Sequence, residues 1–446
     1  MDDFFSVLQS NRDKSSIVKN VSSIPSNYVG SKRRLLLHIW DIIEQENIQF
    51  NSVFDAFSGS AMVSLLFKAM GKKVICNDLL TSSAITAVCL LENASIPITD
   101  KDISFLCKNI PDNCGEFVLQ NYQDKFFTKN ECHFLDRYRR NVEILCGDKF
   151  YCGIDLINKA TLASIPNSNF SIYGKDLKLL RSSHTIGQSF WTEKWRDTTR
   201  KRRDKNNEIV FSSAINEMSD KYKGAFSLMA IENHINRHCF LGGRYYQGQT
   251  LADIEHRLKH QKNKGKEITD IDVSIDKFKT VMSDSNCLVF NSDILDLLEA
   301  QIVHADLLYL DPPYGGASSD YAILYRFLEE YLYEEKLEDL EHIQKGAKRF
   351  SNKRGYQEQF EQLLNLCTSF PTWMLSYNDS SYATIDTITS TIKNAGKKNV
   401  KVFEVPITYQ YRKGKNKVDA EHFKDNYIDE GHKYLERGIE YLILAT

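Results

Sequence analysis

Short apolar runs of strand length alternate with amphipathic helical stretches at both ends of the chain. Residues 62–70 read as a helix that Gly71 ends, and helices are also expected at residues 294–303 and 321–345. Strands that alternate with helices are typical of a mostly parallel sheet. The last two runs can pair with each other as a hairpin, which makes the final strand antiparallel. The expected strands are residues 52–57, 73–78, 287–293, 307–311, 373–379, 400–411 and 441–445.

The alternation fades in the middle of the chain. Between residues 81 and 285 helical and loop patterns dominate, and strands are hard to assign. We therefore expect an α/β fold whose Rossmann-like sheet is built from both ends of the chain, residues 1–84 and 285–446. A largely helical insert, residues 85–284, is expected to separate the two halves of the sheet.

The expected strand at residues 307–311 runs into the sequence Asp-Pro-Pro-Tyr. Two consecutive prolines remove two backbone donors, so neither a strand nor a helix continues beyond Asp311. In an open α/β sheet, ligands bind at the carboxyl ends of the strands. Asp311 and the Pro312 carbonyl can accept the two N–H bonds of an exocyclic amine, and Tyr314 offers a face to a planar base. Two fixed acceptors would aim the amine's lone pair at an electrophile. The alternative interpretation is an ordinary strand-ending turn.

A second group of candidate residues follows the first expected strand. Asp55 lies near the end of that strand, and the small residues 58–61 form a turn that a ligand can approach closely. The next strand ends at Asp78, where an acid is positioned for the hydroxyl groups of a ribose. The turn lacks the G-x-G-x-x-G pattern, so a nicotinamide cofactor is disfavoured.

A glycine-containing turn precedes a helical pattern at residues 35–43. The turn, residues 28–32, reads Tyr-Val-Gly-Ser-Lys. It can bring backbone N–H groups close to an anion, and Lys32 adds a positive charge. The alternative is an ordinary helix start with a surface lysine. The expected strand at residues 287–293 ends in another acid, Asp293.

Basic residues gather in several segments, some of them interleaved with aromatic and amide side chains. Residues 193–205 hold seven Lys or Arg against three acids, and residues 235–248 combine Arg and Tyr with a pair of glycines. Such segments suit contact with nucleic-acid phosphates and base edges. For the charge runs, the alternative is a solvated helix face. The residues expected to contact nucleic acid are Arg200, Arg202, Arg203, Arg237, Arg244, Tyr245, Tyr246, Arg412 and Lys413.

Composition narrows these possibilities only a little. The chain of 446 residues is 42% hydrophobic and 26% charged, with a net charge of −2, all ordinary for a globular protein. It opens on Met-Asp-Asp and has no apolar run of about 18 residues, so we expect no membrane span and a cytoplasmic location. The ten cysteines show no C-x-x-C spacing, and two pairs of histidines at helical spacing lack further ligands. No metal site is predicted.

The order of these motifs resembles that of the Dam-type, alpha-class N6-adenine DNA methyltransferases. The resemblance spans residues 27–80 and 285–446, with part of the insert at residues 235–248. It implies that the cofactor is S-adenosylmethionine. Asp311, Pro312, Pro313 and Tyr314 match the catalytic motif of the family. The residues that match its cofactor motifs are Tyr28, Gly30, Lys32, Asp55, Phe57, Ser58, Gly59, Ser60, Asp78, Asp293 and Ile294.

The resemblance also assigns parts of the cofactor to some of these residues. The turn at residues 28–32 and the segment at residues 55–61 would surround the methionine moiety, Asp78 would bind the ribose, and Asp293 would receive the adenine amine. One position departs from the family pattern, because Ala61 stands where glycine is usual. Its extra methyl group is expected to weaken cofactor binding modestly.

The function implied is methyl transfer to N6 of an adenine that is flipped out of double-stranded DNA. The enzyme would act at a defined site as a monomer, either alone or beside a restriction endonuclease that acts separately. Two alternatives stay open at this point. One is the same chemistry on N4 of cytosine or on adenine in RNA, and the other is a cofactor-binding or DNA-binding module without catalytic activity.

Overall fold

The computed structural model describes the regions that build the sheet and most of the predicted site. The described residues are 14–25, 28, 30–92, 98–146, 214–238, 255, 259, 287–315, 320–351, 353–379, 381–412, 427–429 and 433–446.

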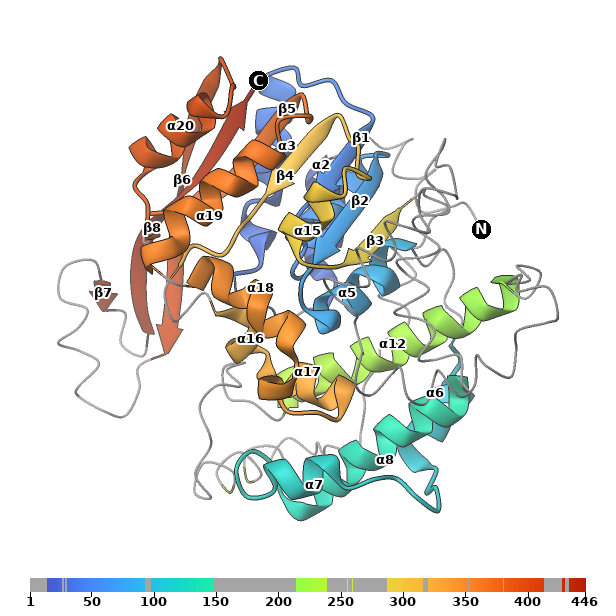
Figure 1. Cartoon of the computed structure of the whole chain (residues 1–446). Coiled ribbons are helices and arrows are strands. Elements are labelled where there is room, and N and C mark those ends of the chain that lie inside the picture. Colours follow the sequence, from blue (N-terminus) through green and yellow to red (C-terminus); the bar gives the residue numbers. More distant parts are fainter. Residues whose placement is uncertain are drawn as a thin grey trace.

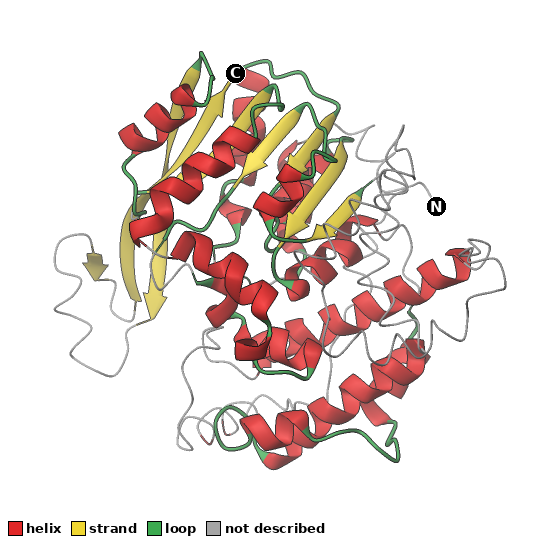
Figure 2. Ribbon diagram, in the orientation of Figure 1, coloured by secondary structure: helices red, strands yellow, loops and turns green. Residues whose placement is uncertain are grey.

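A mixed sheet forms the centre of the described structure (Figures 1 and 2). Its strands lie in the order β3-β2-β1-β4-β5-β8-β6, and β7 pairs with β8 outside this path. The first five strands of this order are parallel, whereas β8 runs antiparallel between β5 and β6. The bounds are β1 Ser52–Asp55, β2 Lys73–Asp78, β3 Leu288–Asn291, β4 Leu307–Leu310, β5 Thr372–Asn378, β6 Val400–Arg412, β7 Tyr427–Asp429 and β8 Lys433–Ala445. The predicted fold class and the predicted pairing of the last long strands are confirmed.

Helices cover both faces of this sheet. In Figure 1, α15 (Ile294–Glu299), α19 (Lys353–Leu366) and α20 (Ile385–Asn394) lie in front of the strands. The helices α2 (Lys14–Ser23), α3 (Leu36–Gln45) and α4 (Met62–Ala69) contribute to the core on the other face.

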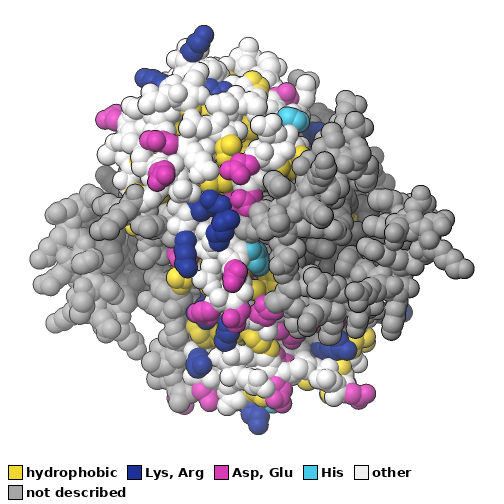
Figure 3. All heavy atoms as spheres, in the orientation of Figure 1, with side chains coloured by type: hydrophobic (Ala, Val, Ile, Leu, Met, Phe, Trp, Pro, Cys, Tyr) yellow, Lys and Arg dark blue, Asp and Glu magenta, His cyan; other side chains and the backbone are white. Residues whose placement is uncertain are grey.

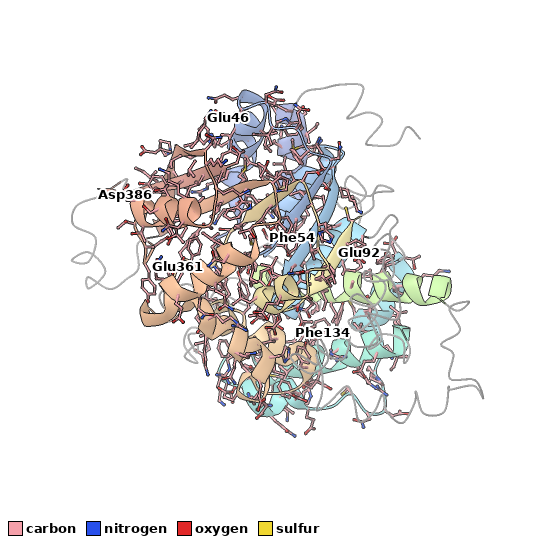
Figure 4. The ribbon with its side chains drawn as sticks, turned by 45° about the horizontal axis from the view of Figure 1, so that its top comes forward. Glu46, Phe54, Glu92, Phe134, Glu361 and Asp386 are labelled. Carbon is pink, nitrogen blue, oxygen red and sulfur yellow. The ribbon has the colours of Figure 1, made fainter. Side chains whose placement is uncertain are left out.

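Successive residues of a strand enter opposite cores, as the two-residue period of a strand requires. Val53 of β1 belongs to the core with α3 and α4, whereas Phe54 belongs to the core with α15, α19 and α20. Figure 4 shows Phe54 inside the molecule, and Glu92 near β3. Glu92 accepts the N–H of Val289 at 2.8 Å, which secures this edge strand.

The described part of the insert is helical. It comprises α6 (Asp100–Lys108), α7 (Phe117–Tyr122), α8 (Lys129–Cys146) and α12 (Ala214–His238), which lie below the sheet in Figure 1. Before them come α5 (Thr81–Ala87) and the π-helical stretch η2 (Val88–Glu92). Tyr138 of α8 donates to the Ser227 carbonyl of α12 at 2.9 Å. Tyr331 of α17 (Arg326–Tyr333) donates to the Leu135 carbonyl of α8, also at 2.9 Å. These helices therefore share a core with the C-terminal half, and the domain limits at residues 84 and 284 stay a prediction.

Three expected elements have different bounds in the structure. The helix expected after Asp293 ends at Glu299, and Gln301 then adopts a positive φ of 53°. The last strand begins at Lys433 because it pairs with β6 along its length. Residues 321–345 form several short elements rather than one helix. These are α16 (Tyr321–Leu324), α17, the 3-10 turn η5 (Leu337–Asp339) and the start of α18 (Glu341–Ser351).

The topology explains where a ligand can bind. The chain leaves the sheet after β2 and α5 for the insert, and it returns as β3 at the edge beside β2. From β1 the parallel strands continue to β2 and β3 on one side and to β4 and β5 on the other. The strand order therefore reverses between β1 and β4, and such a switch point opens a crevice at the carboxyl ends of the strands. Among the described helices, none is both long and apolar enough to span a lipid bilayer.

Candidate active site

A cavity that opens to solvent lies at this switch point, with about 930 Å³ of non-atom space that includes part of the open solvent. Its place at the carboxyl ends of the strands is where ligands bind in open α/β sheets. Every residue that the sequence predicts for cofactor binding lines it, and so do Asp311 and Pro313 of the predicted catalytic motif. The lining comes from segments that are far apart in the chain, including the ends of β1, β2 and β4, the start of α15, and α16 and α18.

The turn before α3 is held by close packing against aromatic rings. Gly30 has a φ of 79°, and a Cβ at this position would lie 2.8 Å from the hydroxyl of Tyr321. The ring of Tyr28 stacks on Tyr325 and Tyr321, with centroid distances of 4.7 and 5.7 Å. Tyr321 and Tyr325 follow the Asp-Pro-Pro-Tyr segment in the chain, so this stack joins the N-terminal turn to the catalytic segment.

The small-residue turn after β1 is fixed by Asp78. The Oδ2 atom of Asp78 accepts the N–H of Gly59 at 2.7 Å, and its Oδ1 accepts the N–H of Leu80 at 2.9 Å. Burial raises the pKa of Asp78 to about 6, although these backbone bonds act in the opposite direction. Gly59 has a φ of 47°, and a Cβ there would lie 2.9 Å from the ring of Tyr28.

Ala61 does not line the cavity; it is the residue before α4 and has a left-handed backbone, with a φ of 59°. A glycine adopts this conformation without the steric cost that alanine incurs. Alanine at this position therefore strains the local backbone. Because Ala61 does not line the cavity, the structure gives no support to the expected weakening of cofactor binding.

Asp55, at the end of β1, is a buried carboxylate with few partners. Its exposed fraction is 1%, and its Oδ2 accepts the hydroxyl of Ser64 at 2.6 Å. Its Oδ1 is buried and has no hydrogen-bond partner of normal geometry in the part of the chain that the structure describes. Burial raises the pKa of Asp55 to about 7, against the lowering effect of the Ser64 hydroxyl.

Asp311, just after β4, has the opposite surroundings. Three groups converge on its Oδ1 atom: the ammonium of Lys32 at 3.0 Å, the hydroxyl of Tyr314 at 2.7 Å and the hydroxyl of Ser376 at 2.9 Å. Lys32 is 7% exposed, and its ammonium also lies 4.9 Å from the centre of the Tyr314 ring. Lys32 lines the cavity as predicted, but its charge lies on the predicted catalytic aspartate.

The rest of the catalytic segment is fixed by its neighbours. Pro312 is buried, and the partly exposed Tyr314 ring packs edge-to-face with Tyr377 at a centroid distance of 5.2 Å. Gly315 has a φ of 90°, and a Cβ there would overlap the ring of Tyr382. The N–H of Tyr382 donates to the Tyr314 carbonyl at 3.0 Å. The segment is thus fixed on both sides of Tyr314.

Asp293 is the capping residue before α15 and accepts two hydrogen bonds from the protein. Its Oδ1 accepts the N–H of Leu295 at 2.9 Å, and its Oδ2 accepts Nε of Arg349 at 2.7 Å. Arg349 belongs to α18, whose residues Gly346, Ala347 and Phe350 also line the cavity. This helix was not predicted to be part of the site. The Gly-Ala pair within its basic amphipathic pattern could have indicated a close approach to a ligand.

The predicted DNA-contacting residues stay predictions, because the structure describes none of their side chains. Arg237 lies on α12 and Arg412 ends β6, but their side chains are outside the described part. The remaining ones lie outside the described residues altogether, namely Arg200, Arg202, Arg203, Arg244, Tyr245, Tyr246 and Lys413. A basic surface that was not predicted lies on α18, where Lys345 and Lys348 are exposed. Basic side chains gather in this part of the face shown in Figure 3.

Comparison with known proteins identifies the chemistry. Residues 28–386 match the family of D12 class N6 adenine-specific DNA methyltransferases. The type II methyltransferase M2.HphI of Haemophilus parahaemolyticus is 26% identical over 392 residues, which covers 88% of this chain and 94% of that protein. These findings confirm the resemblance seen in the motifs and favour adenine in DNA over cytosine or RNA. The chain belongs to the D12 class N6 adenine-specific DNA methyltransferases, and it is an enzyme that methylates adenine in DNA.

Proposed function

We propose that the enzyme uses S-adenosylmethionine, bound in the cavity at the β1–β4 switch point, to methylate an adenine turned out of duplex DNA at a defined site. When bound, this cofactor supplies a methyl group on a positively charged sulfur, an electrophile that a neutral amine can attack. The fit rests on the chain itself. Asp55 presents a buried oxygen without a hydrogen-bond partner of normal geometry among the described residues, and this carboxylate lines the cavity.

Asp55 and its neighbours would hold the amino-acid end of the cofactor. A buried carboxylate oxygen without a donor favours a cationic ligand, and the ammonium of a methionine moiety is one. The turn at Ser58, Gly59 and Ser60 leaves room for the backbone to approach the ligand. Asp78 would accept the ribose hydroxyls, since its carboxylate lines the cavity and the N–H groups of Gly59 and Leu80 hold it in place.

Asp293 and Ile294 would contact the adenine of the cofactor. Both oxygens of Asp293 already accept a protein donor, so the adenine amine would share an oxygen with Leu295 or Arg349. Gly346, which has no side chain, and the small Ala347 leave space beside this carboxylate. A Cβ on Gly346 would lie 3.1 Å from Asp293 Oδ2 and 2.6 Å from a methyl group of Leu79.

The target base would bind at the catalytic segment. Asp311 and the Pro312 carbonyl accept the two N–H bonds of the N6 amine, while Tyr314 stacks on the ring. This draws the amine's lone pair away from the ring and directs it toward the electrophile, so no strong base is needed. The proton leaves to solvent after transfer. A base inside the duplex stack cannot reach residues at the sheet edge, so the adenine must be flipped out.

DNA would approach over the insert and α18. The basic segments of the insert, with Arg237, supply charges for phosphate contacts, and exposed Lys345 and Lys348 extend this charge to a helix that lines the cavity. The relative named above is a type II methyltransferase, and we propose that this enzyme is likewise site-specific, acting in the cytoplasm as a monomer. A restriction endonuclease that acts separately is part of the same proposal.

One observation supports this function best: Asp55, Asp78 and Asp311, from three strand ends, line one cavity. The test is methyl transfer from labelled S-adenosylmethionine to unmethylated genomic DNA, followed by digestion to nucleosides and mass spectrometry. We expect N6-methyladenine. Calorimetric titration of the cofactor into the same preparation gives a second readout. The proposal would be contradicted if the cofactor neither bound nor was consumed in the presence of folded protein and intact DNA.

A further inference from the structure

The carboxylate of Asp311 is held through one of its two oxygens. Three groups reach Oδ1, and they come from separate segments: Lys32 from η1 (Lys32–Arg34), Tyr314 from the loop after β4, and Ser376 from the middle of β5. Within the described residues, no donor reaches Oδ2. Since a carboxylate oxygen has about two lone-pair sites, Oδ1 is saturated and Oδ2 is the oxygen left for a ligand.

Ser376 reaches Asp311 because of strand register. Strand β5 pairs in parallel with β4, with Leu375 opposite Leu310, so the next residue of β5 lies beside Asp311. Ser376 is fully buried, and its neighbours Leu375 and Tyr377 point into the core under α19 and α20. A buried hydroxyl requires a hydrogen-bond partner, and this one donates to the Asp311 carboxylate at 2.9 Å.

We propose that Ser376 is a positioning residue for the methyl transfer: it fixes the Asp311 carboxylate with Oδ1 toward the protein and Oδ2 toward the target amine. This inference rests on the proposed function. The last torsion of an aspartate side chain is broad, so an unrestrained carboxylate would rotate and exchange its oxygens. Tyr314 and Lys32 also hold Oδ1, but Tyr314 is assigned to the base and Lys32 lines the cavity. Ser376 does not line the cavity; its hydroxyl donates to Asp311 at 2.9 Å and lies 3.2 Å from the Tyr314 hydroxyl, which is bonded to the same Oδ1, so its contribution acts through the Asp311 carboxylate.

The decisive variant is Ser376→Ala, measured at saturating cofactor and DNA in a single turnover. We expect the rate to fall about 10- to 100-fold, because a misplaced acceptor no longer directs the lone pair of the amine toward the electrophile. The dissociation constant for S-adenosylmethionine should stay within about threefold of the wild type, and that for DNA should rise by no more than the about three- to tenfold that the target amine contributes. A rate within about twofold of the wild type would overturn the proposal.

The matched control is Ser64→Ala. Ser64 is also fully buried and donates to a buried aspartate, Asp55, at 2.6 Å, but on the cofactor side of the cavity. Its removal should weaken cofactor binding about three- to tenfold and leave the saturated single-turnover rate within about threefold. If both serine variants changed the same quantity, a general loss of packing would explain them and the proposal would fail.

A second readout does not depend on turnover. Duplexes that carry adenine or purine at the mapped target position differ only by the 6-amino group. With S-adenosylhomocysteine bound, the wild type should prefer the adenine duplex by about three- to tenfold, because Oδ2 and the Pro312 carbonyl accept that amine. In Ser376→Ala this preference should shrink toward one. An unchanged preference would overturn the proposal, since a merely structural serine would leave it intact.

If Ser376→Ala fails to fold, the same measurements are made on Ser376→Cys, because the thiol has a similar size but is a weak donor. A folded cysteine variant with a reduced rate supports the proposal, and one with the full rate contradicts it. The two levels of the account can fail separately. Absence of adenine methylation in the wild type would contradict the proposed function, whereas an active wild type with an active Ser376→Ala would contradict only the role of Ser376.

Discussion

Two aspartates at the carboxyl ends of neighbouring strands have opposite surroundings. Asp55, after β1, is 1% exposed and has a single side-chain donor, and its Oδ1 has no hydrogen-bond partner of normal geometry among the described residues, although the Phe57 N–H acts to lower its pKa. Asp311, after β4, has two hydroxyl donors and an ammonium on one oxygen. The residue type and the sheet edge are the same. The two residues differ in the number of hydrogen-bond donors around the carboxylate. Few donors suit Asp55 to a cationic ligand, and donors gathered on one oxygen suit Asp311 to a neutral amine.

The largest effect should come from Asp311→Ala. We expect methyl transfer to fall by about 10³-fold or more, because the variant loses the acceptor that orients the amine. Cofactor affinity should change by less than about threefold, since Asp55 and Asp78 are untouched. Transfer of labelled methyl groups and calorimetry on the same preparation measure both. An equal loss of cofactor binding would assign Asp311 to the cofactor and break the comparison.

Lys32→Met removes the cation from Asp311 and makes its surroundings more like those of Asp55. We expect the rate to fall about 10- to 100-fold and the free energy of unfolding to fall by about 1–3 kcal/mol. This is less than for a fully buried pair, because the Asp311 side chain is 18% exposed. Denaturant titration and single-turnover kinetics test this. If Lys32→Met weakened cofactor binding without slowing the saturated reaction, Lys32 would have the cofactor-binding role expected from the sequence.

Asp55→Asn should act on affinity and on its pH dependence. In the wild type, burial raises the pKa of Asp55 to about 7, so a proton competes with the cationic ligand at lower pH. Cofactor affinity should therefore fall by about tenfold between pH 8 and pH 6. In the asparagine variant affinity should be about tenfold lower at pH 8 and nearly independent of pH above about 6.5.

The stability of the cofactor-free protein should change with pH in the opposite sense. Because the folded-state pKa of Asp55 is raised, the folded chain binds this proton more tightly than the unfolded chain does. Its contribution to stability therefore increases as the pH falls from about 7 toward 4.

Calorimetric titrations of the cofactor at several pH values, into the wild type and Asp55→Asn, measure the effect on binding. An affinity that rose at low pH would contradict the assignment of Asp55 to a cation.

The smallest effect concerns how DNA reaches Asp311. Lys345→Ala combined with Lys348→Ala removes two exposed charges from α18. We expect the Michaelis constant for DNA to rise about two- to fivefold, with a shallower dependence of binding on salt, and cofactor affinity to stay unchanged. Binding to a labelled duplex across a salt series is the measurement. The same slope in both proteins would place the DNA elsewhere.

The sequence predicted the parts of this site that lie in short motifs at strand ends. Asp55, Asp78, Asp293 and Asp311 each follow a recognisable apolar run, and a parallel sheet brings such strand ends to one edge. The members of the predicted cofactor set at strand ends line one cavity for this reason, and Tyr28, Gly30 and Lys32 join them from the turn before α3. The roles of these residues in binding stay predictions.

The parts that the sequence analysis missed depend on contacts between distant segments. Ser376 is one serine in an apolar strand, and it meets Asp311 only through the register of β4 and β5. Lys32 is far from Asp311 in the chain, so its local pattern pointed to the cofactor instead. Arg349 reaches Asp293 only because α18 packs over the cavity. None of these pairs has a spacing that a local pattern could reveal.

The most direct test of the contrast between the two aspartates is to measure Asp55→Asn and Asp311→Asn side by side. Each variant is titrated with S-adenosylmethionine and then assayed in a single turnover at saturating cofactor. The account predicts a crossed result: Asp55→Asn raises the dissociation constant and keeps the saturated rate, whereas Asp311→Asn keeps the dissociation constant and loses the rate. If both variants lost affinity and rate together, the two carboxylates would form one undivided site, and the division of roles would be wrong.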